Sequence, residues 1–209
     1  MATTKKAKDK LPKIRKNKEK FITEEEYLKN EWVAETKSEY HAGKVLAMAG
    51  ATLVHNQITS NLVRHIGNCL EDKDCSVLGN DMLVYLEECK KYVYPDVVVI
   101  CEEPIFAKKA KGRSEAINNP QIIVEVLSDS TAEYDMGEKM KCYLKLKSLN
   151  QYIIVSSERK LIITYTKDKN NDFKVKTYSE NEDILVGECE IPMEKIYHKI
   201  GFDVENDGK

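Results

Sequence analysis

The chain has 209 residues, of which 42% are hydrophobic and 33% charged, values typical of a globular protein. No stretch approaches the roughly 20 apolar residues that a membrane span needs, and the N-terminus lacks the apolar core of a signal peptide. We therefore expect a soluble cytoplasmic protein with no membrane partner.

Charge is unevenly distributed although the net charge is only −2. Residues 1–20 are rich in Lys and Arg with few apolar anchors, which predicts a disordered basic arm. The arm either solubilises the protein or contacts a phosphate backbone. We expect one domain over residues 21–200 and a polar tail over residues 201–209.

The order of the predicted elements is typical of an α/β or α+β domain. Thr23 and Glu26 indicate a capping box at the start of a short helix, and a hairpin follows around His41-Ala42-Gly43. Apolar residues recur every four positions from His55 to about Glu71, which predicts an amphipathic helix. Strands are predicted at Ser76–Leu78, Met82–Leu86, Val97–Cys101 and Ile122–Leu127, then a helix over Glu133–Leu146, then strands at Tyr152–Val155, Leu161–Tyr165 and Phe173–Tyr178.

Six cysteines are scattered along the chain without a C-x-x-C pair. They lack the close spacing of a zinc site, and the chain is longer than a disulfide scaffold. We expect reduced thiols, as is usual in a cytoplasmic protein.

Two carboxylates stand next to apolar strands. Glu125 lies inside Ile122–Leu127, and Asp96 directly precedes the apolar residues Val97–Ile100. An unpaired buried charge costs several kcal/mol, so such acids are paired, hydrogen-bonded or bound to metal. If the two strands form an antiparallel hairpin, Asp96 and Glu125 become cross-strand neighbours about 5 Å apart.

A cation between these acids would relieve their repulsion. Oxygen-rich sites suit Mg²⁺ or Mn²⁺, and a phosphodiester would complete the coordination of such an ion. The alternative is that Glu125 pairs with a basic side chain and Asp96 only closes a strand.

Lysines surround the two acidic positions. Lys139 shares one face of the second predicted helix with Cys142, Tyr143 and Leu146, so it is expected to point inward. There it would orient water or stabilise negative charge, or else form a salt bridge with Glu125. The intervening loop carries the basic residues Lys108, Lys109, Lys111 and Arg113, within reach of flanking phosphates. His55 is expected to cap its helix.

Several segments together resemble one protein family. The resemblance lies in four segments: Tyr94-Pro95-Asp96, Glu125-Val126-Leu127-Ser128, Gly79-Asn80-Asp81 and Tyr134 to Lys139. Through them the chain resembles the Uma-two family of restriction endonucleases, which belongs to the PD-(D/E)xK superfamily. The resemblance covers about Phe21 to Val155. It implies a restriction-endonuclease-like mixed sheet flanked by helices.

The resemblance also implies a set of site residues. Asp96 and Glu125 would bind the metal, Asp81 would be a further ligand, and Glu39 an additional catalytic acid. Leu127 occupies the position where the superfamily usually has lysine, and Lys139 would replace that lysine. Ala42 and Lys44 occupy turn positions where the family often has acidic or amide residues.

The first hypothesis is therefore a Mg²⁺-dependent endonuclease that hydrolyses DNA, with Glu39, Asp96, Glu125 and Lys139 as catalytic residues. Cleavage of a duplex would be easiest for a homodimer with two sites. The second hypothesis is an inactive nucleic-acid-binding module of the same fold. The third is a protein-interaction domain in which Glu125 and Lys139 form only a buried ion pair.

Overall fold

The computed structural model describes residues 20–107, 115–127, 135–180 and 182–202. Its helical elements are α1 (Glu24–Glu31), α2 (Leu53–Cys69), η1 (Glu87–Cys89), η2 (Asp135–Lys139), α4 (Met140–Tyr143) and α5 (Met193–Ile196). Among these described residues, no helix has both the length and the apolar character that a membrane crossing requires.

A six-stranded sheet forms the centre of the molecule, in the order β11-β10-β9-β8-β6-β3. Its strands are β3 (Ser76–Leu78), β6 (Val97–Ile100), β8 (Ile122–Leu127), β9 (Gln151–Ser156), β10 (Ile162–Lys167) and β11 (Phe173–Tyr178). β8 pairs with β9 in parallel and with β6 antiparallel. β8 is a nearly continuous apolar run because side chains are buried on both of its faces.

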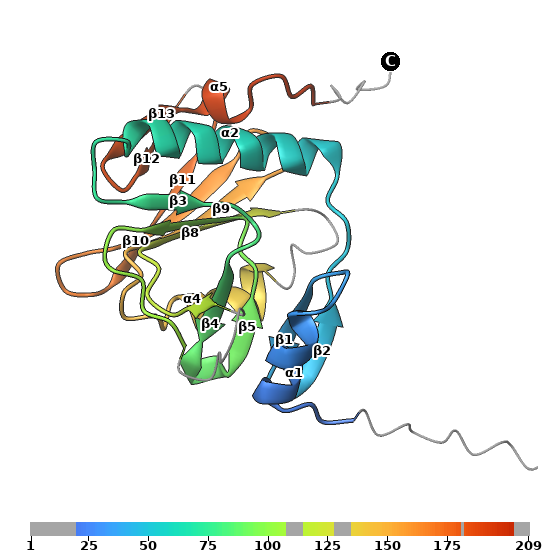
Figure 1. The fold of residues 1–209 in the computed structure, drawn as a ribbon. Coiled ribbons are helices and arrows are strands. Elements are labelled where there is room, and N and C mark those ends of the chain that lie inside the picture. Colours follow the sequence, from blue (N-terminus) through green and yellow to red (C-terminus); the bar gives the residue numbers. More distant parts are fainter. Residues whose placement is uncertain (1–19, 108–114, 128–134, 181, 203–209) are drawn as a thin grey trace, which may run out of the picture.

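A five-stranded sheet lies below it in Figure 1, in the order β2-β1-β5-β4-β7. Its strands are β1 (Ser38–His41), β2 (Lys44–Ala47), β4 (Leu83–Leu86), β5 (Lys91–Val93) and β7 (Ala116–Ile117). The β1–β2 turn has positive φ at both Ala42 (47°) and Gly43 (107°), as a tight two-residue hairpin turn requires. This turn fixes the register in which β1 presents Glu39.

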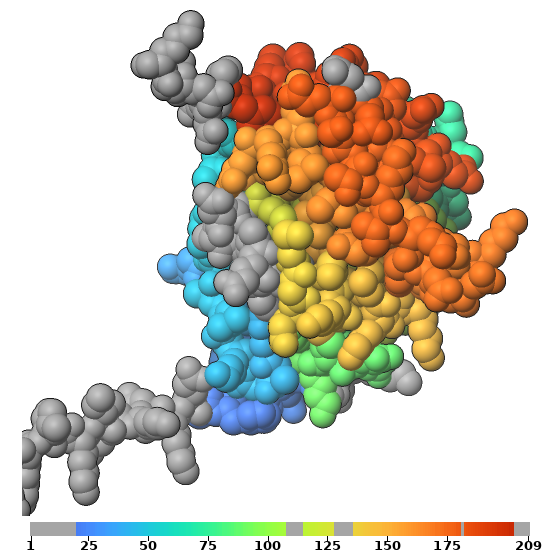
Figure 2. All heavy atoms as spheres, turned by 180° about the vertical axis from the view of Figure 1, so that it is seen from behind, coloured from blue at the N-terminus to red at the C-terminus, as the bar shows by residue number. Residues whose placement is uncertain are grey.

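The two faces of the six-stranded sheet are covered differently. α2 crosses one face together with α5 and the hairpin of β12 (Asp183–Val186) and β13 (Cys189–Pro192), and they enclose an apolar core with Ile58, Leu62 and Ile66. The other face packs against α4 and residues of the five-stranded sheet. From behind, the C-terminal strands and α5 form the upper part of the surface and the N-terminal hairpin the lower left (Figure 2).

The predicted fold class is confirmed, and most predicted elements are present. Strands Ser76–Leu78, Ile122–Leu127 and Phe173–Tyr178 have the predicted bounds. Thr23 caps α1 by accepting a hydrogen bond from the Glu26 N–H. The prediction omitted β5, β7, β12, β13 and α5. The arm at 1–19 and most of the tail lie outside the described residues.

The prediction of reduced cysteines is wrong for this structure. All six form disulfides, which join Cys69 to Cys189, Cys75 to Cys101 and Cys89 to Cys142. The partners are 120, 26 and 53 residues apart in sequence, so local spacing contains no sign of them. The fold, and not a local motif, brings each pair together.

Candidate active site

The candidate site lies where β6 begins, next to β8. The pairing of Val97 with Val124 continues to place Asp96 opposite Glu125, as the hairpin argument predicted. Both side chains are buried, with 9% and 3% of their residues' surface exposed. Buried carboxylates so close together require cations or hydrogen-bond donors around them.

Lys139 provides such a cation to two carboxylates. Its Nζ lies 2.9 Å from Oε1 of Glu125 and 3.0 Å from Oε1 of Glu39. Lys139 is the last residue of η2, a single π-helical turn, and is 5% exposed. The predicted inward orientation is therefore confirmed. The salt bridge to Glu125 that was the alternative role of Lys139 is present as well.

Tyr143 orients Glu125 from the same helical segment. Its hydroxyl donates a hydrogen bond of 2.7 Å to Oε1 of Glu125. Burial, followed by the negative charge of Glu125, raises the pKa of Tyr143 well above its ordinary value. The phenol therefore stays protonated and acts as a donor.

Glu39 enters the site from β1 of the other sheet. Its Oε2 lies 3.1 Å from Nε2 of His41, and its Oε1 accepts the backbone N–H of Tyr94 at 3.2 Å. Burial is the largest influence on Glu39 and opposes ionisation, but the bonds from His41, Lys139 and Tyr94 outweigh it and lower the pKa of Glu39. Glu39 is thus held as a carboxylate.

Asp96 is held by two donors of different kinds. Its Oδ2 accepts the backbone N–H of Val126 at 2.7 Å, and its Oδ1 lies 2.8 Å from Nε2 of His55. The prediction that His55 caps its helix is wrong, because Thr52 is the cap and its hydroxyl accepts the backbone N–H of His55, the third residue of α2. The contact of the His55 imidazole with Asp96 is a role that the prediction missed.

Asp81 is not in contact with this network. Its side chain is 89% exposed, and its Oδ1 accepts a hydrogen bond of 2.8 Å from Lys37. Its charge does act on the nearby phenol of Tyr94, whose pKa is raised by burial first and then by the charges of Glu31, Asp81 and Glu39. Asp81 therefore lies at the margin of the site.

Other predicted site residues fall outside the described part of the chain. These are the loop residues Lys108, Lys109, Lys111 and Arg113. Within the described residues, no three His, Cys, Asp or Glu side chains are arranged to hold a metal ion by themselves. A metal here would have to take the rest of its coordination from water or substrate.

Sequence reasoning missed three participants: His41, His55 and Tyr143. His41 stands two residues from Glu39 on β1, so period-two alternation would have placed both on one face. Tyr143 follows Lys139 by four residues, which is a neighbouring position on a helix. No local signal links His55 to Asp96, because they are 41 residues apart.

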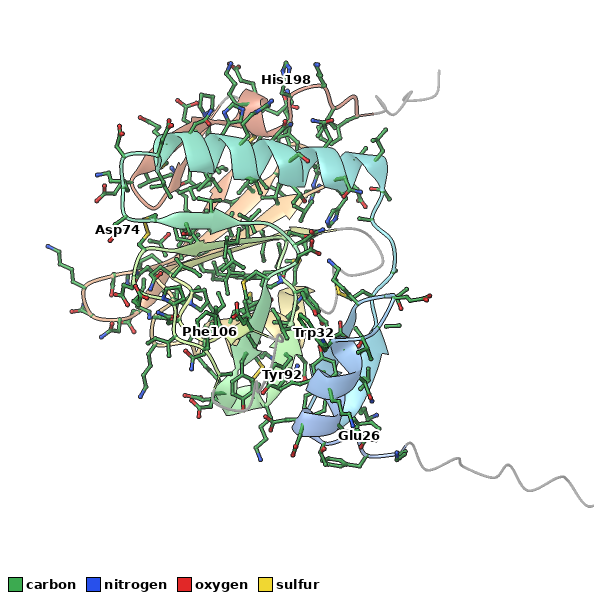
Figure 3. The ribbon with its side chains drawn as sticks, in the orientation of Figure 1. Glu26, Trp32, Asp74, Tyr92, Phe106 and His198 are labelled. Carbon is green, nitrogen blue, oxygen red and sulfur yellow. A yellow bond between two sulfur atoms is a disulfide. The ribbon has the colours of Figure 1, made fainter. Side chains whose placement is uncertain are left out.

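A cluster of tyrosine side chains holds β1 against β5. Tyr92 on β5 lies at the lower end of the molecule near α1 and Trp32, while His198 lies at the opposite end beside α5 (Figure 3). Tyr92 packs with Tyr27, Tyr40 and Tyr85, with ring centroids 4.4 to 6.0 Å apart. This aromatic cluster fixes β1 against β5, and so positions Glu39 near Tyr94.

Comparison with known proteins agrees with this architecture. A family model described as "Uma2: Putative restriction endonuclease" matches residues 24–194. The chain belongs to the Uma2 family. The match spans α1 to α5 and contains Glu39, Asp96, Glu125 and Lys139.

Relatives of this Uma2 protein include two uncharacterized proteins of Synechocystis sp. (strain PCC 6803). One is 37% identical over 136 residues, which are 65% of this chain and 75% of the relative. The other is 31% identical over 161 residues, which are 77% of this chain and 82% of the relative.

A solved structure supports the fold. The crystal structure of a protein from Anabaena variabilis, titled a putative nuclease belonging to DUF820, matches with a TM-score of 0.63 at 15% identity. The match covers 78% of this chain and 91% of that one. Family and fold together place the Uma2 chain among nuclease-like proteins.

Proposed function

We propose that this Uma2 protein is a metal-dependent endonuclease that hydrolyses phosphodiester bonds in DNA. The observation that carries the proposal is the buried cluster of Glu39, Asp96, Glu125 and Lys139 at the junction of the two sheets. Burying three carboxylates and a lysine together is costly, and sites of this kind are concentrated where chemistry is done.

The donor set suits Mg²⁺ or Mn²⁺. Mg²⁺ is commonly held by one or two carboxylates, with waters and substrate phosphates completing its coordination. Asp96 and Glu125 would provide those carboxylates, which agrees with the lack of a three-residue ligand group among the described residues. When bound, the metal would supply Lewis-acid stabilisation and an activated water.

The chain's own residues then have distinct tasks. The Nζ of Lys139 would donate a hydrogen bond to the phosphate and stabilise its developing negative charge. Glu39 pairs with Lys139 and orients it, and Tyr143 holds Oε1 of Glu125 in place. His55 and the Val126 N–H hold the two oxygens of Asp96. Groups hydrogen-bonded to metal ligands set the ligands' orientation in this way.

Basic residues would bind the DNA phosphates that flank the reacting one. Lys108, Lys109, Lys111 and Arg113 follow β6 in the chain and would contact phosphates on either side of the scissile bond. Asp81, at the margin, would join the metal's coordination only through water or after leaving Lys37. Two sites in a homodimer would allow both strands of a duplex to be cut.

One observation favours a second candidate. The lysine and the three acids already bond to one another or to His41, His55, Tyr94, Val126 and Tyr143, so the network is stable as an ion-pair cluster without a metal. A nucleic-acid-binding module that has lost catalysis would look the same. It would bind DNA equally well with and without metal.

The deciding experiment is metal titration combined with nicking of supercoiled plasmid. The wild-type protein should bind Mn²⁺, as measured by calorimetry, and should nick DNA. Glu125→Gln and Asp96→Asn should each lose both properties. Glu138→Gln is the matched control, because the Glu138 side chain is 80% exposed and its pair with Lys91 is long, at 4.0 Å. Metal-independent DNA binding without any nicking would refute the enzyme and support the binding module.

A further inference from the structure

One disulfide is built into the segment that carries the site. Cys142 lies in α4, three residues after Lys139 and directly before Tyr143, and it is bonded to Cys89 in η1. Residues on a single helical turn move together, so displacement of Cys142 also displaces Lys139 and Tyr143. The disulfide is thus a covalent anchor for two groups that contact Glu125.

The other end of this anchor also leads to the site. Cys89 lies two residues before β5 (Lys91–Val93), after which the N–H of Tyr94 binds Glu39. The disulfide therefore closes a ring of contacts from Cys89 through Tyr94, Glu39 and Lys139 to Cys142. The Lys91–Glu138 pair, at 4.0 Å, also joins the two segments.

The remaining two disulfides are remote from the carboxylates. Cys101 is five strand residues beyond Asp96, about 16 Å along β6. Cys69 ends α2, whereas His55 lies near its start, about 21 Å away along the helix. These two bonds join core elements and serve as internal controls.

Access to the anchor comes from one side. Cys142 is 8% exposed, whereas Cys89 is partly exposed between the exposed residues Glu88 and Lys90. A thiolate attacks along the S–S axis and needs one reachable sulfur. Cys89 is the more exposed partner, so its Sγ is assigned as the atom attacked and Sγ of Cys142 as the leaving group.

We propose that Cys89–Cys142 is a thiol–disulfide exchange site through which a dithiol reductant controls the nuclease site. A thiolate of the reductant bonds to Sγ of Cys89, the Cys89–Cys142 bond breaks, and Cys142 leaves as a thiolate that takes up a proton. The second thiol of the reductant then displaces Cys89, so the reductant becomes a disulfide and the protein a dithiol. Oxidised protein holds Lys139 and Tyr143 in place, and reduced protein releases them. This regulation rests on the proposed function, but the exchange and its structural effect do not.

The test is a redox titration of the full chain with dithiothreitol at graded ratios of its reduced and oxidised forms. Alkylation and peptide mass spectrometry report the state of each disulfide, and hydrogen exchange reports protection of residues 139–143. When Cys89–Cys142 opens, we expect protection of this segment to fall by about tenfold or more, with the plasmid-nicking rate falling in parallel. A Cys89→Ser/Cys142→Ser variant should behave like reduced protein and ignore dithiothreitol.

The matched control is Cys75→Ser/Cys101→Ser, which should keep the full response. Free thiols at Cys89 and Cys142 after purification without reductant would overturn the proposal, as would unchanged protection of residues 139–143 when this bond is reduced. If the Cys89 and Cys142 variant does not fold, the wild-type titration decides by itself. Exchange that loosens the segment in a protein that never nicks DNA would support the switch and refute only the nuclease.

Discussion

The two faces of the six-stranded sheet bury different kinds of polar group. On the α2 side, the buried amide of Asn61 donates to the carbonyl oxygens of Ile196 and His198, and its oxygen accepts a hydrogen bond from the Arg64 guanidinium. On the other side, Glu125 and Lys139 bury full charges together with Glu39. The hydrogen bonds of a buried amide are thus sufficient to join α2 to the segment that contains α5. Burying the charges on the second face costs more free energy than burying an amide does. Such a cost is expected at a site that is kept for chemistry.

The largest effect should come from Lys139→Met. It leaves Glu39 and Glu125 buried without their shared cation, which should lower the free energy of unfolding by about 3–5 kcal/mol. Nicking should fall by roughly 10²–10³-fold, because a donor to the developing charge is lost. Lys141→Met, at an exposed position of the same turn, is the control. Equal activity in both variants, measured by plasmid nicking, would remove Lys139 from the mechanism.

A mutation on the apolar face should separate stability from chemistry. Leu62 is fully buried under α2, so Leu62→Ala should cost about 2–5 kcal/mol in urea unfolding. Below its unfolding transition, the variant should still nick DNA within about twofold of wild type, since Leu62 lies about two helical turns from His55, the α2 residue that contacts Asp96. A large loss of activity in folded Leu62→Ala would show that the faces are coupled.

His55 tests a polar link between α2 and the charged face, because its side chain reaches from the start of α2 to Asp96. His55→Ala should weaken Mn²⁺ binding by about 10–100-fold, as expected when a group orienting a ligand is removed. His55→Gln, which retains a donor, should recover part of that affinity. Calorimetry on both variants measures the difference, and identical affinities would mean that the His55 imidazole does not orient Asp96 for metal binding.

Acidification should weaken the charged face in a defined direction. The pKa of Glu39 is lowered in the folded protein, so its carboxylate contributes stability above the unfolded pKa, near 4.3. That contribution is lost as pH falls through the lower folded value. In urea unfolding, the stability difference between wild type and Glu39→Gln should shrink as pH drops below about 4.3. A difference independent of pH would contradict the assigned network.

The smallest effect is expected at Asp81. Its pair with Lys37 is exposed, so Asp81→Asn should change unfolding free energy by less than about 1 kcal/mol. As a marginal residue, it should also leave Mn²⁺ affinity nearly unchanged. An affinity loss similar to that of Asp96→Asn would move Asp81 into the metal's own coordination.

Local pattern predicted much of this structure. The β-branched run of β8, the four-residue period of α2 and the helical spacing of Lys139 with Tyr143 are properties of short segments, and each was recovered. The hairpin register that pairs Asp96 with Glu125 was also recovered, because both acids stand near one loop.

What sequence reasoning missed depends on distant pairing. β12 and β13 are short strands whose apolar residues pack under α2, and β5 is a three-residue strand between two neighbours. The pairing of Cys89 with Cys142 and the contact of His55 with Asp96 form only when α2, β6 and α4 pack together in the folded protein. No periodicity within a segment records such contacts.

Separation along the chain has a consequence for synthesis. Glu39 and His41 leave the ribosome about a hundred residues before Lys139, a delay of roughly 5–20 s at ordinary elongation rates. Cys69 waits even longer for Cys189, which is 120 residues further on. Until then, the β1–β2 hairpin carries carboxylate and imidazole without their counterpart. A nascent chain therefore cannot assemble the Glu39–Lys139–Glu125 cluster, and any hydrolytic activity is withheld, until Lys139 has left the ribosome.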